Sequence, residues 1–273
     1  MGRSESTANL SHLCRALENY ASADGAEPVN KPCEVADRLS GALYLAHSTS
    51  DANFSDICRC GHLSSAERLA AERSTPLKPS CAELVLGTAG CVFFYISPFR
   101  FPSTGCGLLF AKSLEARHSE HGAASPFDSG GLIRAFNRTD VAEPPRHFLS
   151  RHELPIPEHR GYLGRSMSFL FLKPEHYVEG VDPYRPGPIG LTGGDQRRWT
   201  HEVRIPGRVF VRGSDLQAVF APRSRVAADP EIGDLFQWCM REGVDRILLD
   251  TPRRDDFEAL RRECVAYVRR KLY

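Results

Sequence analysis

The chain has 273 residues, and its 35 Lys and Arg residues against 34 Asp and Glu residues give a formal net charge of +1. This length is sufficient for one large domain with a substantial core, and the near-neutral charge excludes a global field that would attract nucleic acid or an anionic membrane. Nine cysteines without a framework spacing are typical of reduced intracellular thiols. We find neither a signal peptide nor the roughly 20 apolar residues of a membrane span, so the sequence predicts a soluble, cytoplasmic protein with no membrane partner.

Residues 1–35 are predicted to form an N-terminal helical extension, because apolar residues recur at helical spacing between Leu10 and Tyr20 before a flexible stretch. Residues 36–273 are predicted to form the main domain. It begins with a buried strand at Leu43–Ala46 and a helix between Ser50 and Leu63 that stops at Gly61. The β-rich apolar run Cys91–Ile96 predicts a central strand.

The stretch from Gly105 to Pro157 is rich in Gly, Pro, Ser and His, which predicts long loops around a short helix near Leu132–Phe136. A helix from Pro230 to Gly243, a strand at Val244–Leu249 and a final helix at Asp255–Tyr267 are expected near the end. Between Pro157 and Pro230 we expect four short strands, at Phe169–Leu172, Thr200–Ile205, Arg208–Val211 and Leu216–Phe220. The elements predict an α+β fold without the alternation of a doubly wound sheet.

Three sequence blocks resemble those of the DNA-targeting ADP-ribosyltransferase toxins of the DarT type. The first block has the pattern His-x-Thr-x-x-x-Asn-x-x-x-Ile-x-x-x-Gly-x-Leu, filled here from His47 to Leu63. The second is the strand-like run Val92–Pro98, which contains Tyr95. The third opens with Glu202 in the run Glu-Val-Arg-Ile and continues with Leu216–Phe220. The basic and aromatic ending of the chain is similar to the tail of that family.

The resemblance implies an α+β, ADP-ribosyltransferase-like split β-sheet core with flanking helices and long loops. It also implies an NAD-dependent mono-ADP-ribosyltransferase, of a toxin or defence type, that consumes NAD as substrate and modifies a macromolecule. Nucleic acid, as single-stranded DNA or RNA, is the expected acceptor, and an antitoxin protein is a candidate partner.

The chemistry of transfer gives each matched residue a role. Cleavage of the bond to nicotinamide passes through an oxocarbenium-like state, which a carboxylate beside the ribose stabilises; we assign Glu202 to this catalytic role. His47, Thr49 and Asn53 are expected to bind the nicotinamide ribose end through hydrogen bonds, and Tyr95 to stack on the cationic ring. The family's phosphate-binding or transfer-assisting Arg matches Arg73, with Arg68 as the alternative.

Two segments are expected to recognise the acceptor. One is Ser125–Gly131; the other contains Arg197, Arg198 and Trp199, whose basic and aromatic side chains suit an unpaired nucleotide strand. A buried Trp199 with solvated arginines is an equally good interpretation.

Other interpretations remain open from the sequence. Taken singly, His47 is more simply a strand-end histidine and Glu202 a solvated strand residue. The same cleft would serve an NAD glycohydrolase, or a non-catalytic module that binds a nucleotide or a partner. We expect no metal site, because Cys58-x-Cys60-x-His62 is spaced too tightly for a zinc knuckle and lacks a second pair of ligands.

Overall fold

In the computed structural model, the described residues are 32–39, 42–72, 80–96, 105–136, 144–184, 200–250 and 257–272. The helix predicted between Leu10 and Tyr20 therefore lies outside the described residues. The first described element is α2, Pro32–Leu39, which spans the domain boundary expected at residue 35.

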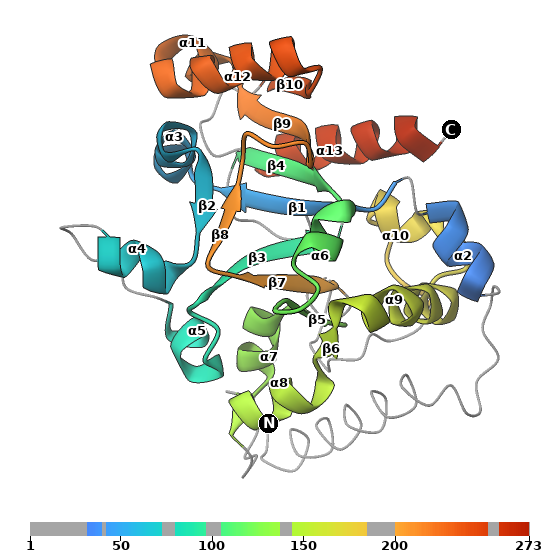
Figure 1. The fold of residues 1–273 in the computed structure, drawn as a ribbon. Helices are drawn as coiled ribbons and strands as arrows, with labels where there is room; N and C mark the ends of the chain where they lie inside the picture. The colour runs from blue at the N-terminus through green and yellow to red at the C-terminus, as the bar shows by residue number, and fades with distance from the viewer. Residues whose placement is uncertain are drawn as a thin grey trace, which may run out of the picture.

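The described strands form one eight-stranded sheet in the order β10-β9-β4-β1-β3-β7-β5-β6 and a small two-stranded sheet of β2 and β8. Figure 1 shows the large sheet in this order from top to bottom. Neighbouring strands are antiparallel except for the parallel pair β9 and β10. The bounds are β1 Tyr44–Thr49, β2 His62–Ser64, β3 Cys91–Ile96, β4 Cys106–Ala111, β5 Ala123–Ser125, β6 Leu154–Pro155, β7 Glu202–Pro206, β8 Arg208–Phe210, β9 Leu216–Pro222 and β10 Asp245–Leu249.

Helices flank this sheet, so the protein has a mixed α+β fold (Figure 1). Their bounds are α3 Asp51–Cys60, α4 Ala66–Glu72, α5 Cys81–Leu86, α6 Ser113–Arg117, α7 Ser129–Phe136, α8 Pro145–His152, α9 Ile156–Leu170, α10 Glu175–Glu179, α11 Arg223–Ala228, α12 Pro230–Glu242 and α13 Phe257–Leu272. None of the helices in the described parts of the chain has the length and apolar character needed to cross a lipid bilayer.

The core lies where the apolar face of the sheet meets the helices. In β3, Val92, Phe94 and Ile96 are buried while the alternating residues are half-buried, as a strand with one dry face requires. Phe94 meets Phe110 of β4 edge to face, with ring centroids 5.6 Å apart. On α12 the buried residues are Ile232, Leu235, Phe236 and Cys239, the stripe that the sequence predicts.

Several elements match their predictions closely. The central strand at Cys91–Ile96 is confirmed, and the helix after β1 ends at Gly61 in the left-handed conformation with φ of 74°. The strands expected at Thr200–Ile205, Arg208–Val211, Leu216–Phe220 and Val244–Leu249 are present as β7 to β10. The short helix expected near Leu132–Phe136 is present as α7, and the last two predicted helices are present as α12 and α13.

Two predictions are wrong. The described part of the stretch Gly105–Pro157 contains three strands, three complete helices and the start of α9, and its β4 lies inside the large sheet between β9 and β1. Its apolar run is only four residues long and stands among Gly and Pro, so composition hid it. The strand expected at Phe169–Leu172 is also incorrect, because Phe169 and Leu170 end α9. A short apolar run does not distinguish a strand from a buried helix end.

The sheet is opened between β1 and β3. Within these two fully described strands, the pairing joins Leu45 with Ile96 and Ala46 with Tyr95 and goes no further. On its other side, β1 pairs with β4 along all six of its residues. Beyond Ala46, therefore, β1 stays with β4 and parts from β3.

The helix ends give a test of the fold. Gly243 ends α12 with φ of 72°, and a Cβ placed there would meet nothing within 4 Å. We expect Gly243→Ala to lower the free energy of unfolding by about 1 kcal/mol, through backbone strain alone. Urea denaturation measures this loss, and Gly243→Asn is the control because Asn tolerates the left-handed conformation better. Equal stability of the Ala variant and the wild type would contradict the left-handed conformation of Gly243 at the end of α12.

Candidate functional site

Glu202 is the first residue of β7 and lies in the interior of the protein, since only 1 % of it is exposed. Its cross-strand partners are Tyr95 of β3 on one side and Ser125 of β5 on the other. Paired residues share a face of the sheet, so Tyr95 and Glu202 lie side by side. Glu202 is therefore not the solvated strand residue that it would be by default.

Two groups donate hydrogen bonds to one oxygen of the Glu202 carboxylate. They are the backbone N–H of Ser129, 3.2 Å from Oε2, and the Ser129 hydroxyl, 3.0 Å from the same atom. Ser129 is the first residue of α7, so the carboxylate lies at the N-terminus of that helix. A helix N-terminus favours a negative charge.

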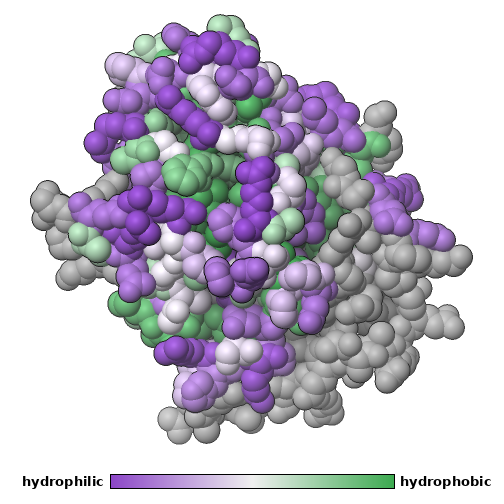
Figure 2. Space-filling view, in the orientation of Figure 1, coloured by the Kyte–Doolittle hydropathy of each residue, from purple (hydrophilic) through white to green (hydrophobic). Residues whose placement is uncertain are grey.

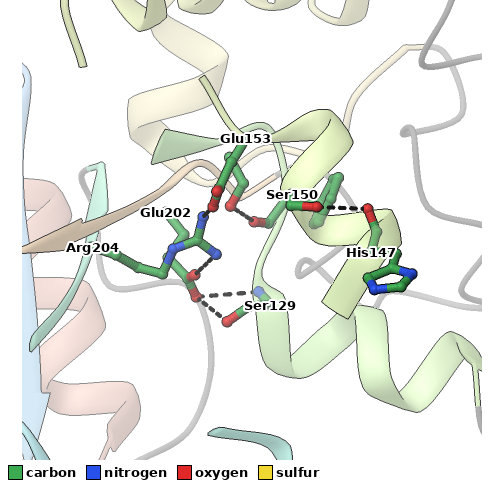
Figure 3. Close-up of polar contacts among 8 residues, drawn as sticks. Ser129, His147, Ser150, Glu153, Glu202 and Arg204 are labelled. Atoms are coloured by element: carbon green, nitrogen blue, oxygen red, sulfur yellow. Dashed lines mark hydrogen bonds and ion pairs between the residues drawn. The ribbon is translucent and has the colours of Figure 1, made fainter. Parts of the chain in front are cut away.

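The other oxygen of Glu202 faces the Arg204 guanidinium, 3.4 Å away. Arg204 is 2 % exposed and donates a second hydrogen bond, of 2.8 Å, to Glu153, the residue between α8 and β6. Figure 3 shows Arg204 between the two carboxylates and Ser129 on the far side of Glu202. The site is thus a buried chain of acidic and basic side chains that ends at the half-buried Glu153.

Burial dominates the electrostatics of Glu202. Removal from water raises the pKa of its carboxyl, and the nearby Asp128 carboxylate raises it further. The Arg204 charge and the hydrogen bonds from Ser129 act in the opposite direction. Carboxyl groups with strongly raised pKa values are frequent at functional sites.

A cavity of about 460 Å³ lies beside the opened part of the sheet. His47, Thr49 and Asn53 line it from β1 and α3, and Cys91 and Phe93 line it from β3. The structure therefore brings all three residues predicted to bind the nicotinamide ribose end to one cavity. This volume is within the range of small-molecule sites.

His47 spans the opening between the two strands. Its Nδ1 lies 2.9 Å from the Phe93 carbonyl oxygen of β3, a contact that replaces strand pairing at this level. Burial lowers the pKa of the imidazole. At neutral pH, His47 is accordingly uncharged and able to hydrogen-bond a ligand through Nε2.

The cavity and the carboxylate are adjacent but separate. Alternation places His47 and Thr49 on one face of the sheet and Ala46, Tyr95 and Glu202 on the other. Within the described residues, neither Tyr95 nor Glu202 lines the cavity. Cys91 and Phe93 have the same orientation as Tyr95, however, so the cavity has walls from both faces of the sheet.

Of the two arginines predicted as alternatives for binding phosphate, Arg68 lies within the described residues and Arg73 does not. Arg68 is exposed on α4 and bound to Glu72, 2.8 Å away, which also pairs with Arg208. Arg59 of α3, a residue that sequence reasoning did not single out, lines the cavity and is paired with Asp56 at 2.7 Å. Arg73, Arg197, Arg198 and Trp199 lie outside the described residues.

Sequence reasoning missed the partners of Glu202. Arg204 stands two residues after it on the same strand, and this spacing of two was the available signal. Ser129 and Asp128 fall in Ser125–Gly131, the segment predicted to contact the acceptor, and the structure places this segment beside the carboxylate. Glu153 gave no sequence signal.

Three potential metal ligands, Cys58, Cys60 and His62, stand close together in the sequence. Cys58 is buried and Cys60 is exposed, while His62 directs its Nδ1 to the Cys60 carbonyl oxygen at 2.8 Å. In the ranges of the chain that the structure describes, no three His, Cys, Asp or Glu side chains gather as a metal site would require.

No protein-family model matches the chain, and a search of curated proteins gives no significant match.

The raised pKa makes the stability depend on pH. The folded state binds the Glu202 proton more tightly than the unfolded chain, so this stabilisation is complete below the unfolded carboxyl pKa of about 4.3 and is lost as the pH rises through the raised value. Glu202→Gln has no such proton to lose. Its melting temperature relative to wild type should rise between about pH 4 and about pH 9, by at least the 2–4 °C that roughly 1 kcal/mol gives. Melting curves measure this, and a pH-independent difference would contradict the burial of an ionisable carboxyl.

Proposed function

We propose that this protein is an NAD-dependent mono-ADP-ribosyltransferase with an ADP-ribosyltransferase-like split sheet. The observation that carries the proposal is the pairing of Tyr95 with Glu202 across β3 and β7. On β1, Ala46 pairs with Tyr95, and His47 is the residue that follows Ala46. These residues come from three sequence blocks and lie on three neighbouring strands. The sequence resemblance assigns stacking, catalysis and ribose binding to the same three residues.

The opening between β1 and β3 supports a single substrate that contacts residues of both sheet faces. A ligand that enters between β1 and β3 meets His47 from one face and the Tyr95 side of β3 from the other, because the cavity has walls from both strands. NAD is elongated, so its adenosine and nicotinamide ends can occupy different parts of such a cleft. We therefore assign the cavity of His47, Thr49 and Asn53 to NAD and the neighbourhood of Glu202 to the reacting ribose.

Glu202 suits the transfer step. As the bond to nicotinamide lengthens, positive charge develops on the ribose, and a carboxylate in a dry, fixed environment stabilises this charge more strongly than one in water. The same carboxylate can accept the proton of the attacking hydroxyl or amine. Ser129 now donates to Glu202 where a ribose hydroxyl would donate, so we infer that the substrate reaches the carboxylate by exchanging with Ser129.

The acceptor is part of the proposal and rests on the resemblance. Nucleic acid is the class we propose, contacted in part by the segment Ser125–Gly131. Its Ser125 and Ser129 are buried next to Glu202, so an acceptor held by this segment lies beside the reacting ribose once the substrate has displaced Ser129.

The carboxylate is the direct target for a test. We expect Glu202→Gln to reduce transfer of label from NAD by about 10²- to 10⁴-fold, the contribution of a positioned acid–base group. Labelled NAD is incubated with single-stranded DNA, RNA or cell lysate, and labelled macromolecules are counted. Glu242→Gln, the same substitution at an exposed residue of α12, is the matched control and should keep full activity.

The products separate the alternatives. Labelled nucleic acid formed by wild type and by Glu242→Gln supports the transferase. Free ADP-ribose without labelled macromolecule would instead indicate an NAD glycohydrolase. Unchanged NAD with every acceptor, or full activity in a folded Glu202→Gln variant, would contradict the proposal.

The cavity gives a second prediction. Asn53 lines it from the first turn of α3, and Asn53→Ala removes one hydrogen-bonding side chain without approaching Glu202. We expect KM for NAD to rise about 2- to 12-fold, the effect of one hydrogen bond, while kcat stays near the wild-type value. Steady-state kinetics measure both constants. A lower kcat with an unchanged KM would show that the cavity does not bind NAD in the ground state.

A further inference from the structure

A buried chain of hydrogen-bonding side chains lies behind the start of β7. His201, the residue before Glu202, places Nδ1 2.8 Å from Nε2 of His159 and Nε2 3.2 Å from the hydroxyl of Ser166. His159 and Ser166 belong to α9. All three residues are at most 2 % exposed, so the bonds between them form in a medium of low dielectric, where they are strongest.

Tyr177 of α10 holds the backbone at the same point. Its hydroxyl donates to the Ile96 carbonyl oxygen at 3.2 Å and accepts from the His201 N–H at 3.4 Å. The Ile96 N–H in turn donates to the His201 carbonyl oxygen at 3.0 Å. The hydroxyl is thus inserted between the ends of β3 and β7, one residue past the pair of Tyr95 and Glu202.

Position 201 is therefore held twice, through its side chain by α9 and through its backbone by α10. Buried polar groups cost free energy unless they are paired, and packing alone would be served equally well by apolar side chains. What such a network adds is one defined geometry at the atoms that it pairs. Within the described residues, Nδ1 of His159 has no hydrogen-bond partner, so the geometry is defined on the side of His201. Burial lowers the pKa of His159, with a smaller effect in the same direction from Lys112, so His159 is neutral in this chain.

We propose that His201 is a positioning residue that, with Ser166, His159 and Tyr177, fixes the Glu202 carboxylate for the reaction. Successive side chains of a strand leave it on opposite faces, so His201 anchors from one face the backbone that carries Glu202 on the other. The inference rests on the proposed function, and it extends the site to α9 and α10. A displacement of about 1 Å at a reacting group can reduce the rate by about 100-fold.

Tyr177→Phe and Ser166→Ala test the inference by removing one hydroxyl each. We expect either change to lower kcat by about 10- to 100-fold and to leave KM for NAD unchanged, because binding in the cavity of His47 does not use this chain. The matched control is Tyr267→Phe, which removes a hydroxyl bound to Asp245 at 2.8 Å at the remote edge of the sheet. Tyr267→Phe should keep the wild-type kcat.

Backbone hydrogen exchange supplies a readout that does not need activity. In Tyr177→Phe, the amides of Ile96 and His201 should exchange faster, while those of β9 keep their wild-type rates; Tyr267→Phe should leave Ile96 and His201 unchanged. Unchanged exchange at these two amides would overturn the inference. So would faster exchange with an undiminished kcat, and in that case the proposed function would stand. A wild-type protein that leaves NAD unchanged would overturn both.

Discussion

The removal of the Glu202 carboxylate from water is the constraint on which the surrounding structure depends. A buried carboxylate is tolerated where donors replace its hydration, and here Ser129 and Arg204 supply them. Arg204, itself buried, needs the second carboxylate of Glu153. The burial of Glu202 therefore fixes the start of α7, the face of β7 and the connection between α8 and β6 relative to one another. This arrangement gives the site a preorganised set of dipoles.

The register of the large sheet links this carboxylate to residues far away in the sequence. Tyr95 and Glu202 are 107 positions apart and become direct cross-strand partners, while β1 contributes His47 at the level where it parts from β3. The opening lets residues from both faces border one space, which a continuous sheet would keep apart. In the proposed reaction, NAD would bind on the His47 side and react on the Glu202 side.

The sequence was most predictive where local rules apply. The apolar run Leu43–Ala46 predicted a strand, and the helical spacing between Ser50 and Leu63 predicted a helix that stops at Gly61, because both patterns obey local geometry. Both elements are present, with the strand extending to Thr49. It failed for β4, whose place in the sheet depends on partners far along the chain. Glu202 could be singled out, but Ser129 is 73 residues away and reaches it only through the tertiary fold. For the same reason, nothing in the dipeptide His201-Glu202 revealed that His201 faces α9.

The most direct test of this account is a crystal structure with a non-hydrolysable NAD analogue. The account predicts that the analogue lies in the opening between β1 and β3, with one part among His47, Thr49 and Asn53. Its nicotinamide ribose should be within hydrogen-bonding distance of the Glu202 carboxylate, in the place of Ser129. An analogue bound elsewhere, or bound in the cavity with the bonds of Ser129 to Glu202 intact and the ribose remote from them, would contradict the assignment of Glu202.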